Sequence, residues 1–481
     1  MSARSRVPTA ASAAAGAALA DASPSVFWLD DPDRPEPLPP LSGRQHADLV
    51  VVGGGYTGLW TALRSVERYP DASVMVLEAG RCGNEASGRN GGFAAASLTH
   101  GFGNGLARWP DELDTLDRLG AQNLADLAAD VDRYGIDCHL EATGALDVAL
   151  APWQVEELAE YADELTARGH QVQLLSGEQT RKRVDSPTYL GGLYDAAGTV
   201  MVEPARLAWG LRRACLERGV VIHEGTRVTA VADERGRPVV HTVSRDGVAA
   251  AVRADRVALA TNAFRPLLRR LRLMTVPVYD HVLVTEPLSE AQLASIGWSG
   301  REGIGDVANQ FHYYRLTRDN RILWGGYDAV YHYGSRIDRS LEQSASTHAT
   351  LAEHFLETFP QLQGIRFTHR WGGVIDTCTR FSAFFGTARH GRVGYALGYT
   401  GLGVAATRFG ADVMLDLLHG ETTERTELEM VRSTPLPFPP EPARALGINL
   451  TRWSLARADR NQGRRNSWLR TLDRFGLGFD S

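Results

Sequence analysis

The chain has 481 residues, of which 43% are hydrophobic and 22% are charged, with a formal net charge of −6. This composition is ordinary for a globular protein, and the acidic balance gives no reason to expect a nucleic-acid partner. The length exceeds what one simple core supports, so we expect two connected domains. No stretch has the length and apolarity of a membrane span.

The cysteine pattern argues against a metal site and against a disulfide framework. Cys82, Cys138, Cys215 and Cys378 are scattered, and no two of them form a C-x-x-C pair. Reduced thiols in the cytoplasm are the simpler interpretation, so we expect a cytoplasmic protein with no bound metal.

Residues 1–47 are expected to form a leader and an entry arm. The first 20 residues are rich in alanine and lack the apolar core of a signal peptide, which predicts a disordered leader. Residues 24–40 are rich in proline, which disfavours regular structure. The apolar side chains of Phe27, Trp28 and Leu29 are expected to pin this arm to the protein surface.

The most informative stretch is an apolar strand, residues 49–52, followed by Gly53, Gly55 and Gly58. Four consecutive apolar residues indicate a strand buried on both faces, as in a parallel sheet. In the spacing G-x-G-x-x-G, the first glycine makes the turn and the second lets the backbone approach a pyrophosphate. The third lets the next helix, predicted over residues 59–67, pack against the strand.

A second apolar strand, residues 73–77, ends at Glu78. A dinucleotide-binding fold places an acid that binds ribose hydroxyls about 20 residues after the motif. The alternative is an ordinary strand–turn–helix with a surface glutamate, and the complete context makes it the weaker one. The segment 80–92 is then rich in glycine and polar residues, which suits a cofactor longer than a nicotinamide dinucleotide.

The segment from Glu78 to Gly92 resembles the E-A-x-R-x-G-x-x-A-S-G-R-N-G-G run of FAD-dependent amine oxidoreductases in the D-amino-acid oxidase superfamily. The groups most similar are the gamma-glutamylputrescine oxidoreductases and the glycine oxidase-like enzymes. The resemblance extends from about residue 27 to residue 416. It implies an α/β fold, with a discontinuous Rossmann-like FAD-binding domain and a second, antiparallel-sheet α+β substrate domain.

Hydrophobic periodicity predicts the remaining elements in chain order. Helices are expected over 111–134, 153–168, 204–217 and 345–359, strands over 144–150, 220–224, 255–263 and 276–285, a hairpin over 313–326, and a strand–turn–helix over 394–405. We assign 48–104, 190–272 and 370–425 to the FAD-binding domain and 105–189 and 273–369 to the substrate domain. Residues 426–481 form an Arg-rich C-terminal tail, expected as a solvated helix packed on the body rather than a nucleic-acid or membrane contact.

The resemblance implies which residues contact FAD. They are Gly53, Gly55, Tyr56, Thr57 and Gly58 at the first turn, Glu78, Ala79 and Arg81 near the adenosine half, Ser87, Gly88, Arg89, Asn90, Gly91 and Gly92 toward the flavin, Val228 at the adenine, Thr261 and Asn262, and Gly398, Thr400, Gly401, Leu402 and Gly403 at a second glycine motif. Asn262 replaces a glycine of the family pattern. A helix that begins after Gly401 would aim N–H groups at the reduced flavin and stabilise its charge.

The candidate substrate-site residues are His281, Tyr313, Arg315, Trp371 and Tyr399. Tyr399 is favoured because it lies within the second glycine motif, whereas Trp371 fits the core slightly better than a pocket wall. His281 is equally compatible with an ordinary packed histidine. Arg315 either clamps a substrate carboxylate bidentately or pairs with Asp319 across the hairpin.

The function implied is oxidation of a primary or secondary amine, such as an amino acid or a polyamine derivative, to an imine that water hydrolyses. Oxygen or another acceptor would reoxidise the flavin. The alternatives are a flavin dehydrogenase of a hydroxy acid or glycerol phosphate, and a flavin-binding protein without turnover.

The sequence departs from the family at three places, which limits the properties of the family that can be expected of this chain. Lys182 is the only lysine, on a charged stretch, so the lysine-assisted oxygen reduction of sarcosine-oxidase-type enzymes is not expected. Gly373, rather than Cys378, aligns with the flavin attachment point, which favours non-covalent FAD. Phe93 stands where the most similar groups have glutamine, so their substrate cannot be assumed.

Overall fold

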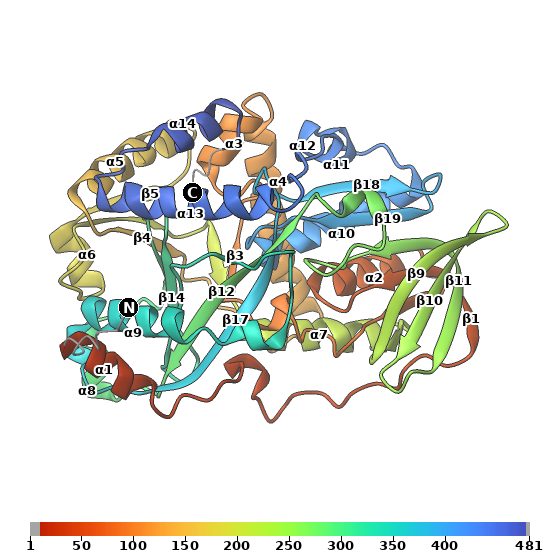
Figure 1. Ribbon diagram of the computed structural model, residues 1–481, viewed down its shortest axis with the longest axis horizontal. Helices are drawn as coiled ribbons and strands as arrows, with labels where there is room; N and C mark the ends of the chain where they lie inside the picture. The colour runs from red at the N-terminus through yellow and green to blue at the C-terminus, as the bar shows by residue number, and fades with distance from the viewer. Residues whose placement is uncertain (1–9, 478–481) are drawn as a thin grey trace.

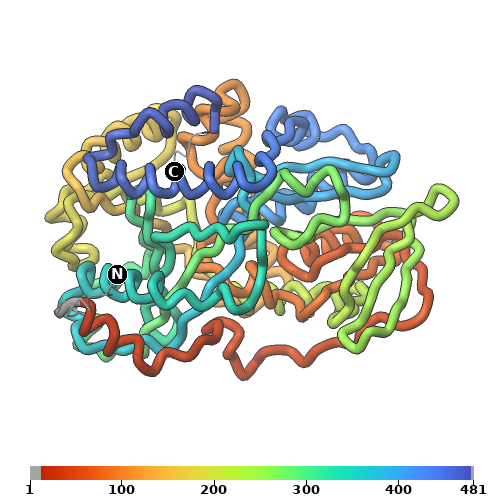
Figure 2. Tube along the Cα trace, in the orientation of Figure 1, coloured from red at the N-terminus to blue at the C-terminus, as the bar shows by residue number. Residues whose placement is uncertain are grey.

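The computed structural model describes residues 10–477 and contains two large sheets, one in each half of the molecule (Figures 1 and 2). The first sheet has eight strands and the second has nine, and a two-stranded sheet joins β3 (Phe93–Ala95) to β7 (Thr199–Met201). The expected α/β fold with a second sheet domain is therefore confirmed.

Five strands of the first sheet are parallel, in the order β19-β11-β1-β2-β8. The strands of this sheet are β1 (Arg44–Val52), β2 (Val74–Leu77), β8 (Val221–His223), β9 (Thr226–Glu234), β10 (Arg237–Ser244), β11 (Ala249–Leu259), β18 (Phe384–Ala388) and β19 (Val393–Leu397). The apolar run at the end of β1 is almost fully buried, as expected for a central parallel strand. Helices α2 (Tyr56–Arg68), α4 (Leu113–Arg133), α7 (Pro204–Glu217) and α10 (Gly403–His419) pack around it.

The second sheet is antiparallel except where β13 runs parallel to β4. Its strands are β4 (Ala145–Ala149), β5 (Val172–Ser176), β6 (Gly191–Asp195), β12 (Val276–Thr285), β13 (Gly303–Asp306), β14 (His312–Leu316), β15 (Ile322–Gly326), β16 (Val330–Tyr331) and β17 (Phe367–Thr377). One face packs on α9 (Ala345–Thr358), and the other faces the first domain through a cluster that contains Trp28, Trp209, Val282 and Trp371.

The remaining helices lie around these layers. They are α3 (Phe102–Arg108), α5 (Pro152–Ala167), α6 (Gly177–Arg183), α8 (Glu290–Ile296), α11 (Glu424–Glu427), α12 (Glu429–Arg432), α13 (Ala443–Arg460) and α14 (Ser467–Arg474), with short 3₁₀ turns η1 (Phe27–Leu29), η2 (Ala86–Gly88), η3 (Arg269–Leu271), η4 (Arg339–Glu342) and η5 (Pro360–Leu362). Within residues 10–477, none of the helices combines the length and apolarity that a membrane crossing requires.

The prediction of a disordered leader is wrong from residue 10 onward, and residues 1–9 lie outside the described part. The alanine-rich segment forms α1 (Ala10–Leu19), which lies beside α9 in both views (Figures 1 and 2). Ala15 and Ala18 are buried in the second domain's core cluster. Alanine has the highest helix propensity, and its small side chain lets two helices approach closely. An alanine-rich segment that lacks larger apolar residues can therefore be a packed helix, and its composition does not by itself indicate disorder.

Three elements fall on the other side of the expected domain boundaries. The strand β6, which begins at Gly191, pairs with β4 and β5, so the chain returns to the first domain only with β7, which pairs with β3. Residues 370–377 of β17 pair with β12 in the second sheet. Helix α4 packs its leucines into the core of the first domain beside α10. Periodicity identifies a strand or helix but does not say which sheet it joins.

The Arg-rich tail packs on the body as two helices, α13 and α14, over the second domain (Figure 1). The Arg444 guanidinium is buried and donates to the Ser335 hydroxyl at 2.7 Å. The Asp459 carboxylate accepts the backbone N–H of Asn309 at 2.9 Å. The prediction of a helix packed on the body is therefore confirmed.

Candidate functional site

The turn from β1 to α2 has the backbone geometry that its three glycines permit. Gly53 has φ +112°, which side chains disfavour, and a Cβ there would overlap the carbonyl oxygen of Ala260. A Cβ at Gly58 would overlap the Gly53 carbonyl oxygen. The turn lies where the carboxyl ends of parallel β1, β2 and β11 meet, the usual ligand edge of such a sheet.

Helix α2 begins at this edge without a side-chain cap from its own N-cap residue, Gly55. The hydroxyl of Ser87 accepts the Tyr56 N–H at 2.9 Å, and a Cβ at Gly55 would lie 2.8 Å from the same oxygen. The glycine-rich segment 80–92 therefore folds back over the first turn of α2. The remaining N–H groups of the first turn of α2, beside small residues, are suited to bind an anion such as a pyrophosphate.

Glu78 ends β2, and its carboxylate joins two turns. Its two oxygens accept the N–H groups of Gly54 and Gly80, each at 2.7 Å, and desolvation raises the pKa of the carboxyl. Strand β9 begins beside it, since the Thr226 N–H donates to the Glu78 carbonyl at 2.8 Å. A cavity of about 250 Å³ lies here, lined by Ala79, Gly225, Arg227, Val243, Ser244 and Arg245.

Two predicted adenosine-side residues have other contacts. The Arg81 guanidinium donates to the carbonyl of Pro35 in the entry arm. Val228 packs against the buried cluster beneath β9. Neither side chain lines the 250 Å³ cavity.

The segment 89–92 is held from both domains. The indole N–H groups of Trp28 and Trp371 donate to the Asn90 and Arg89 carbonyls, each at 3.0 Å. The buried Arg89 guanidinium pairs with Glu342 at 2.8 Å. A Cβ at Gly91 would lie 2.7 Å from the Tyr313 ring. The backbone of this segment therefore packs directly against a side chain of the second sheet.

The second glycine segment, residues 398–403, leads from β19 into α10. Thr400 and Gly401 have φ values of +50° and +90°, and α10 begins after Leu402 without a side-chain cap. The Asp376 carboxylate accepts the Gly398 N–H at 2.5 Å, and burial raises the pKa of this carboxyl to about 7. The atom nearest to a Cβ at Gly401 would be Ile375 Cδ1 at 3.9 Å, which leaves room beside this uncapped helix N-terminus.

The family glycine that Asn262 replaces has a conformational explanation. Asn262 follows β11 with φ +49°, a left-handed conformation that glycine adopts freely and asparagine tolerates better than most residues. Asparagine therefore preserves the backbone turn. Thr261 precedes it at the same edge of the sheet.

One face of the second sheet lies opposite these glycine segments. Cross-strand pairing aligns Tyr313 of β14 with Gly325 of β15 and Val282 of β12, and Asp280 with Gly373 of β17. Residues paired in this way share a face. This face also carries Trp371 and Ile375, which contact the segments 89–92 and 398–403.

A carboxylate and a phenol form the polar centre of this face. The Tyr313 hydroxyl donates to Asp280 Oδ2 at 2.5 Å, and the His281 backbone N–H donates to Asp280 Oδ1 at 2.8 Å. Desolvation raises the pKa of Asp280 to about 6. Tyr313, but not Asp280, belongs to the sequence-based candidates. An isolated acid in the apolar run 276–285 is the signal that could have found it.

In the structure, the Arg315 side chain contacts groups other than Asp319. Its side chain has no exposed surface, donates to the Val202 carbonyl at 2.7 Å, and approaches Glu141 at 3.5 Å. Asp319 instead pairs with Arg321 at 2.6 Å, so the expected hairpin pair does not form. Burial lowers the pKa of Arg315 to about 10. A substrate carboxylate would have to displace these partners.

Three further candidates do not join the Asp280–Tyr313 pair. His281 points to the opposite face of β12, against His348 of α9, and burial lowers the pKa of its imidazole to about 4. Tyr399 packs in the core against α10, where a Cβ at Gly410 would overlap its hydroxyl. Trp371 is 1% exposed and is a core residue that also holds the Arg89 carbonyl.

Residues 48–417 match the protein family described as "DAO: FAD dependent oxidoreductase". The chain is 32% identical over 408 residues to gamma-glutamylputrescine oxidoreductase from Escherichia coli, an alignment that covers 82% of this chain and 89% of that protein. It is 29% identical over 407 residues to "Probable oxidoreductase OrdL" from Haemophilus influenzae, covering 82% and 88%. Among solved structures, glycine oxidase from Geobacillus kaustophilus has the same fold, with a TM-score of 0.67 and 20% identity over 80% of this chain and 96% of that one.

Proposed function

This chain belongs to the DAO family of FAD-dependent oxidoreductases, its cofactor is FAD, and we propose that it oxidises a primary or secondary amine to an imine. When bound, FAD supplies the acceptor for the hydride that leaves the α-carbon of the amine. Water then hydrolyses the imine. The substrate class that we propose comprises amino acids and polyamine derivatives.

The residues of the chain fit this cofactor at both ends. We assign the pyrophosphate to the first turn of α2 beside Gly55, and the adenosine to the surroundings of Glu78. The isoalloxazine ring is assigned to the space between the segments 89–92 and 398–403. The N-termini of α2 and α10, neither of which is capped by the side chain of its own N-cap residue, support this assignment because helix N-termini favour an anionic or electron-rich group, and the room beside Gly401 supports it as well.

The charge of the sheet face is the observation that carries the amine assignment. Asp280 is the acid of this face. The neighbouring cations already have partners, since Arg315 contacts the Val202 carbonyl and Glu141, and Arg89 pairs with Glu342. A hydroxy acid or a glycerol phosphate carries only negative charge and would be repelled by this acid, whereas an amino acid or a polyamine derivative also carries an amino group. An amine needs only orientation and exclusion of water.

Non-covalent attachment of FAD is part of the proposal. Cys378 is fully buried behind Gly398, where its thiol donates to the Ser382 carbonyl at 3.1 Å. Its burial raises the pKa of the thiol and so disfavours the reactive thiolate. Lys182, the only lysine in the sequence, pairs with Glu178 on exposed α6. We propose reoxidation by oxygen or by another acceptor, without lysine assistance.

An anaerobic substrate panel tests the proposal. Purified protein saturated with FAD is mixed with primary and secondary amines, hydroxy acids and glycerol 3-phosphate, and the flavin absorbance near about 450 nm is followed. Bleaching by amines supports the proposed function. Bleaching by hydroxy acids or glycerol phosphate alone assigns the second reaction class, and a protein that no compound bleaches is a flavin-binding protein without turnover.

A further inference from the structure

We propose that Asp280, held by Tyr313, forms a cation subsite that binds an ammonium group of the substrate other than the amine that is oxidised. This inference rests on the proposed function and narrows its substrate class to amines with a second positive charge. Asp280 is then a specificity-determining residue.

Asp280 lacks the counter-ion that a sheltered carboxylate requires. Among the described residues 10–477, its carboxylate contacts the Tyr313 hydroxyl and backbone N–H groups, and it takes part in none of the ion pairs within 4.0 Å. A buried charge is costly unless it is paired and hydrogen-bonded. The two hydrogen bonds orient the carboxylate but do not neutralise it.

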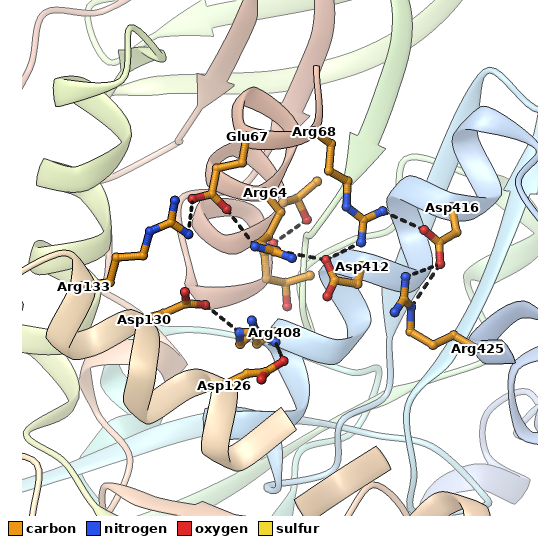
Figure 3. A network of polar contacts seen from close by, with 12 residues as sticks. Arg64, Glu67, Arg68, Asp126, Asp130, Arg133, Arg408, Asp412, Asp416 and Arg425 are labelled. Carbon is orange, nitrogen blue, oxygen red and sulfur yellow. Dashed lines mark hydrogen bonds and ion pairs between the residues drawn. The ribbon is translucent and has the colours of Figure 1, made fainter. Parts of the chain in front are cut away.

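The same chain neutralises other buried acids with arginine. Figure 3 shows Asp416, which has no exposed surface, between Arg68 at 2.6 Å and Arg425 at 2.8 Å. Asp412 likewise pairs with Arg64 and Arg68. Among the described residues, Asp280 and Asp376 have no such arginine partner, and both lie on strands of the second sheet beside the proposed flavin; Asp376 accepts the Gly398 N–H, whereas Asp280 lies beside open space.

The surroundings of Asp280 provide space on the side of the proposed flavin. Its cross-strand neighbour on β17 is Gly373, where the atom nearest to an added Cβ is Arg89 Cβ at 3.8 Å. On the other side, the Tyr313 ring lies against Gly91 and Gly325, which leave room for no side chain but that ring. The Tyr313 hydroxyl therefore points at the Asp280 carboxylate, next to the unfilled space beside the Gly373 backbone.

The chemistry of the reaction explains why the bound cation is a second group. An amine must be neutral to release hydride from its α-carbon, because protonation ties up the nitrogen lone pair that stabilises the product imine. A carboxylate in contact with the reacting nitrogen would favour its protonated form. Asp280 therefore helps only when it binds a cation elsewhere in the substrate.

Three four-carbon amines separate the possibilities, because they differ only at the far end. They are 1,4-diaminobutane, 1-aminobutane and 4-aminobutanoate, which end in a cation, a methyl group and a carboxylate. We expect anaerobic flavin bleaching to half-saturate at about ten- to a hundredfold lower concentration of 1,4-diaminobutane than of 1-aminobutane, the effect of one charged hydrogen bond. The carboxylate-ended amine should be the poorest.

Asp280→Asn keeps the shape and removes the charge. It should abolish the preference for 1,4-diaminobutane, so that in this variant 1,4-diaminobutane and 1-aminobutane half-saturate within about threefold of each other, a difference below a full hydrogen bond. Tyr313→Phe should weaken the preference partly. Asp319→Asn, an exposed change in the β14–β15 turn of the same sheet, serves as the matched control. Binding of 1,4-diaminobutane to chemically reduced enzyme, measured by calorimetry, gives a readout without turnover.

The outcomes keep the two proposals apart. If amines bleach the flavin but the three compounds half-saturate alike, or if Asp280→Asn retains the preference, the cation subsite is wrong and amine oxidation stands. If no amine bleaches the wild-type flavin and hydroxy acids do, the proposed function itself fails. Loss of calorimetric binding in Asp280→Asn, with retained FAD and an unfolding temperature no lower than that of wild type, supports the subsite.

Discussion

Glycines of the first turn act through the absence of a side chain, and Gly58 gives the sharpest test. Gly58→Ala places a methyl group on the Gly53 carbonyl oxygen, which is backbone and cannot rotate away. Overpacking of this kind costs about 1–3 kcal/mol. We expect a lower unfolding temperature and weaker FAD binding in a fluorescence titration.

The matched control for Gly58→Ala is Gly447→Ala in α13, where an added Cβ meets no atom within 4 Å. Because alanine stabilises a helix interior relative to glycine by up to about 1 kcal/mol, this variant should be unchanged or slightly more stable. Equal losses in both variants would show that the turn has no special requirement for glycine.

Substitution of Glu78 is expected to weaken FAD binding more than it lowers the stability of the fold. Its carboxylate accepts two backbone N–H groups and is assigned to the ribose hydroxyls of bound FAD. Removal of a charged acceptor costs about 1.5–3 kcal/mol, or about ten- to a hundredfold in affinity. Glu78→Ala should purify partly without flavin, and added FAD should restore activity. Wild-type FAD affinity in this variant would contradict the ribose assignment.

The raised pKa of Asp280 makes a prediction about stability and pH. Desolvation raises the pKa of this carboxyl to about 6 in the folded chain, from its ordinary value of 3.8 in the unfolded chain, so the folded state holds the proton to higher pH. Stability from this group is therefore lost as pH rises from about 4 to 6. Above pH 6 without substrate, Asp280→Asn should be more stable than wild type, by roughly 1–3 kcal/mol in denaturant unfolding.

At the scale of elements, α2 and α10 each begin at one end of the proposed FAD site, and buried charges tie them together. Figure 3 shows Arg64 and Arg68 of α2 reaching Asp412 and Asp416 of α10. Because Asp416 is fully buried, Asp416→Ala leaves Arg68 and Arg425 without a shared anion. We expect a loss of about 3–5 kcal/mol in the free energy of unfolding.

Arg118→Ala is the control for this network. Arg118 pairs with Glu424, but each side chain is 56% exposed. An exposed pair contributes at most about 1 kcal/mol, so this variant should unfold close to wild type. If Asp416→Ala were equally mild, the network would not hold the two helices together.

At the scale of the whole molecule, α1 closes the outer side of the second domain. Ala15 is 1% exposed against α9, so Ala15→Glu buries an unpaired charge. Ala17→Glu, on the exposed side of the same helix, is the matched control. We expect Ala15→Glu alone to lower the unfolding temperature, while flavin bleaching by amines at lower temperature stays close to wild type. Equal unfolding temperatures would show that α1 is not part of the fold's core.

The sequence by itself determined the dinucleotide-binding unit, because that unit depends on local requirements. Gly53, Gly55 and Gly58 are needed wherever a strand turns tightly into a helix, and Glu78 is fixed by its distance along the chain. The strands, most helices and the second glycine segment followed from periodicity and turns for the same reason. The family resemblance added the order of the segments around FAD.

Only the tertiary structure decided which side chains meet across the two sheets. Asp280 and His281 are neighbours in sequence, and because side chains alternate along a strand, the first points toward Tyr313 and the proposed flavin site and the second toward α9. The partner of Arg315 is Glu141 rather than nearby Asp319 because burial, not sequence distance, sets the pairing. Sheet membership of β6 and the packing of α1 also depend on contacts between distant segments, which no local pattern records.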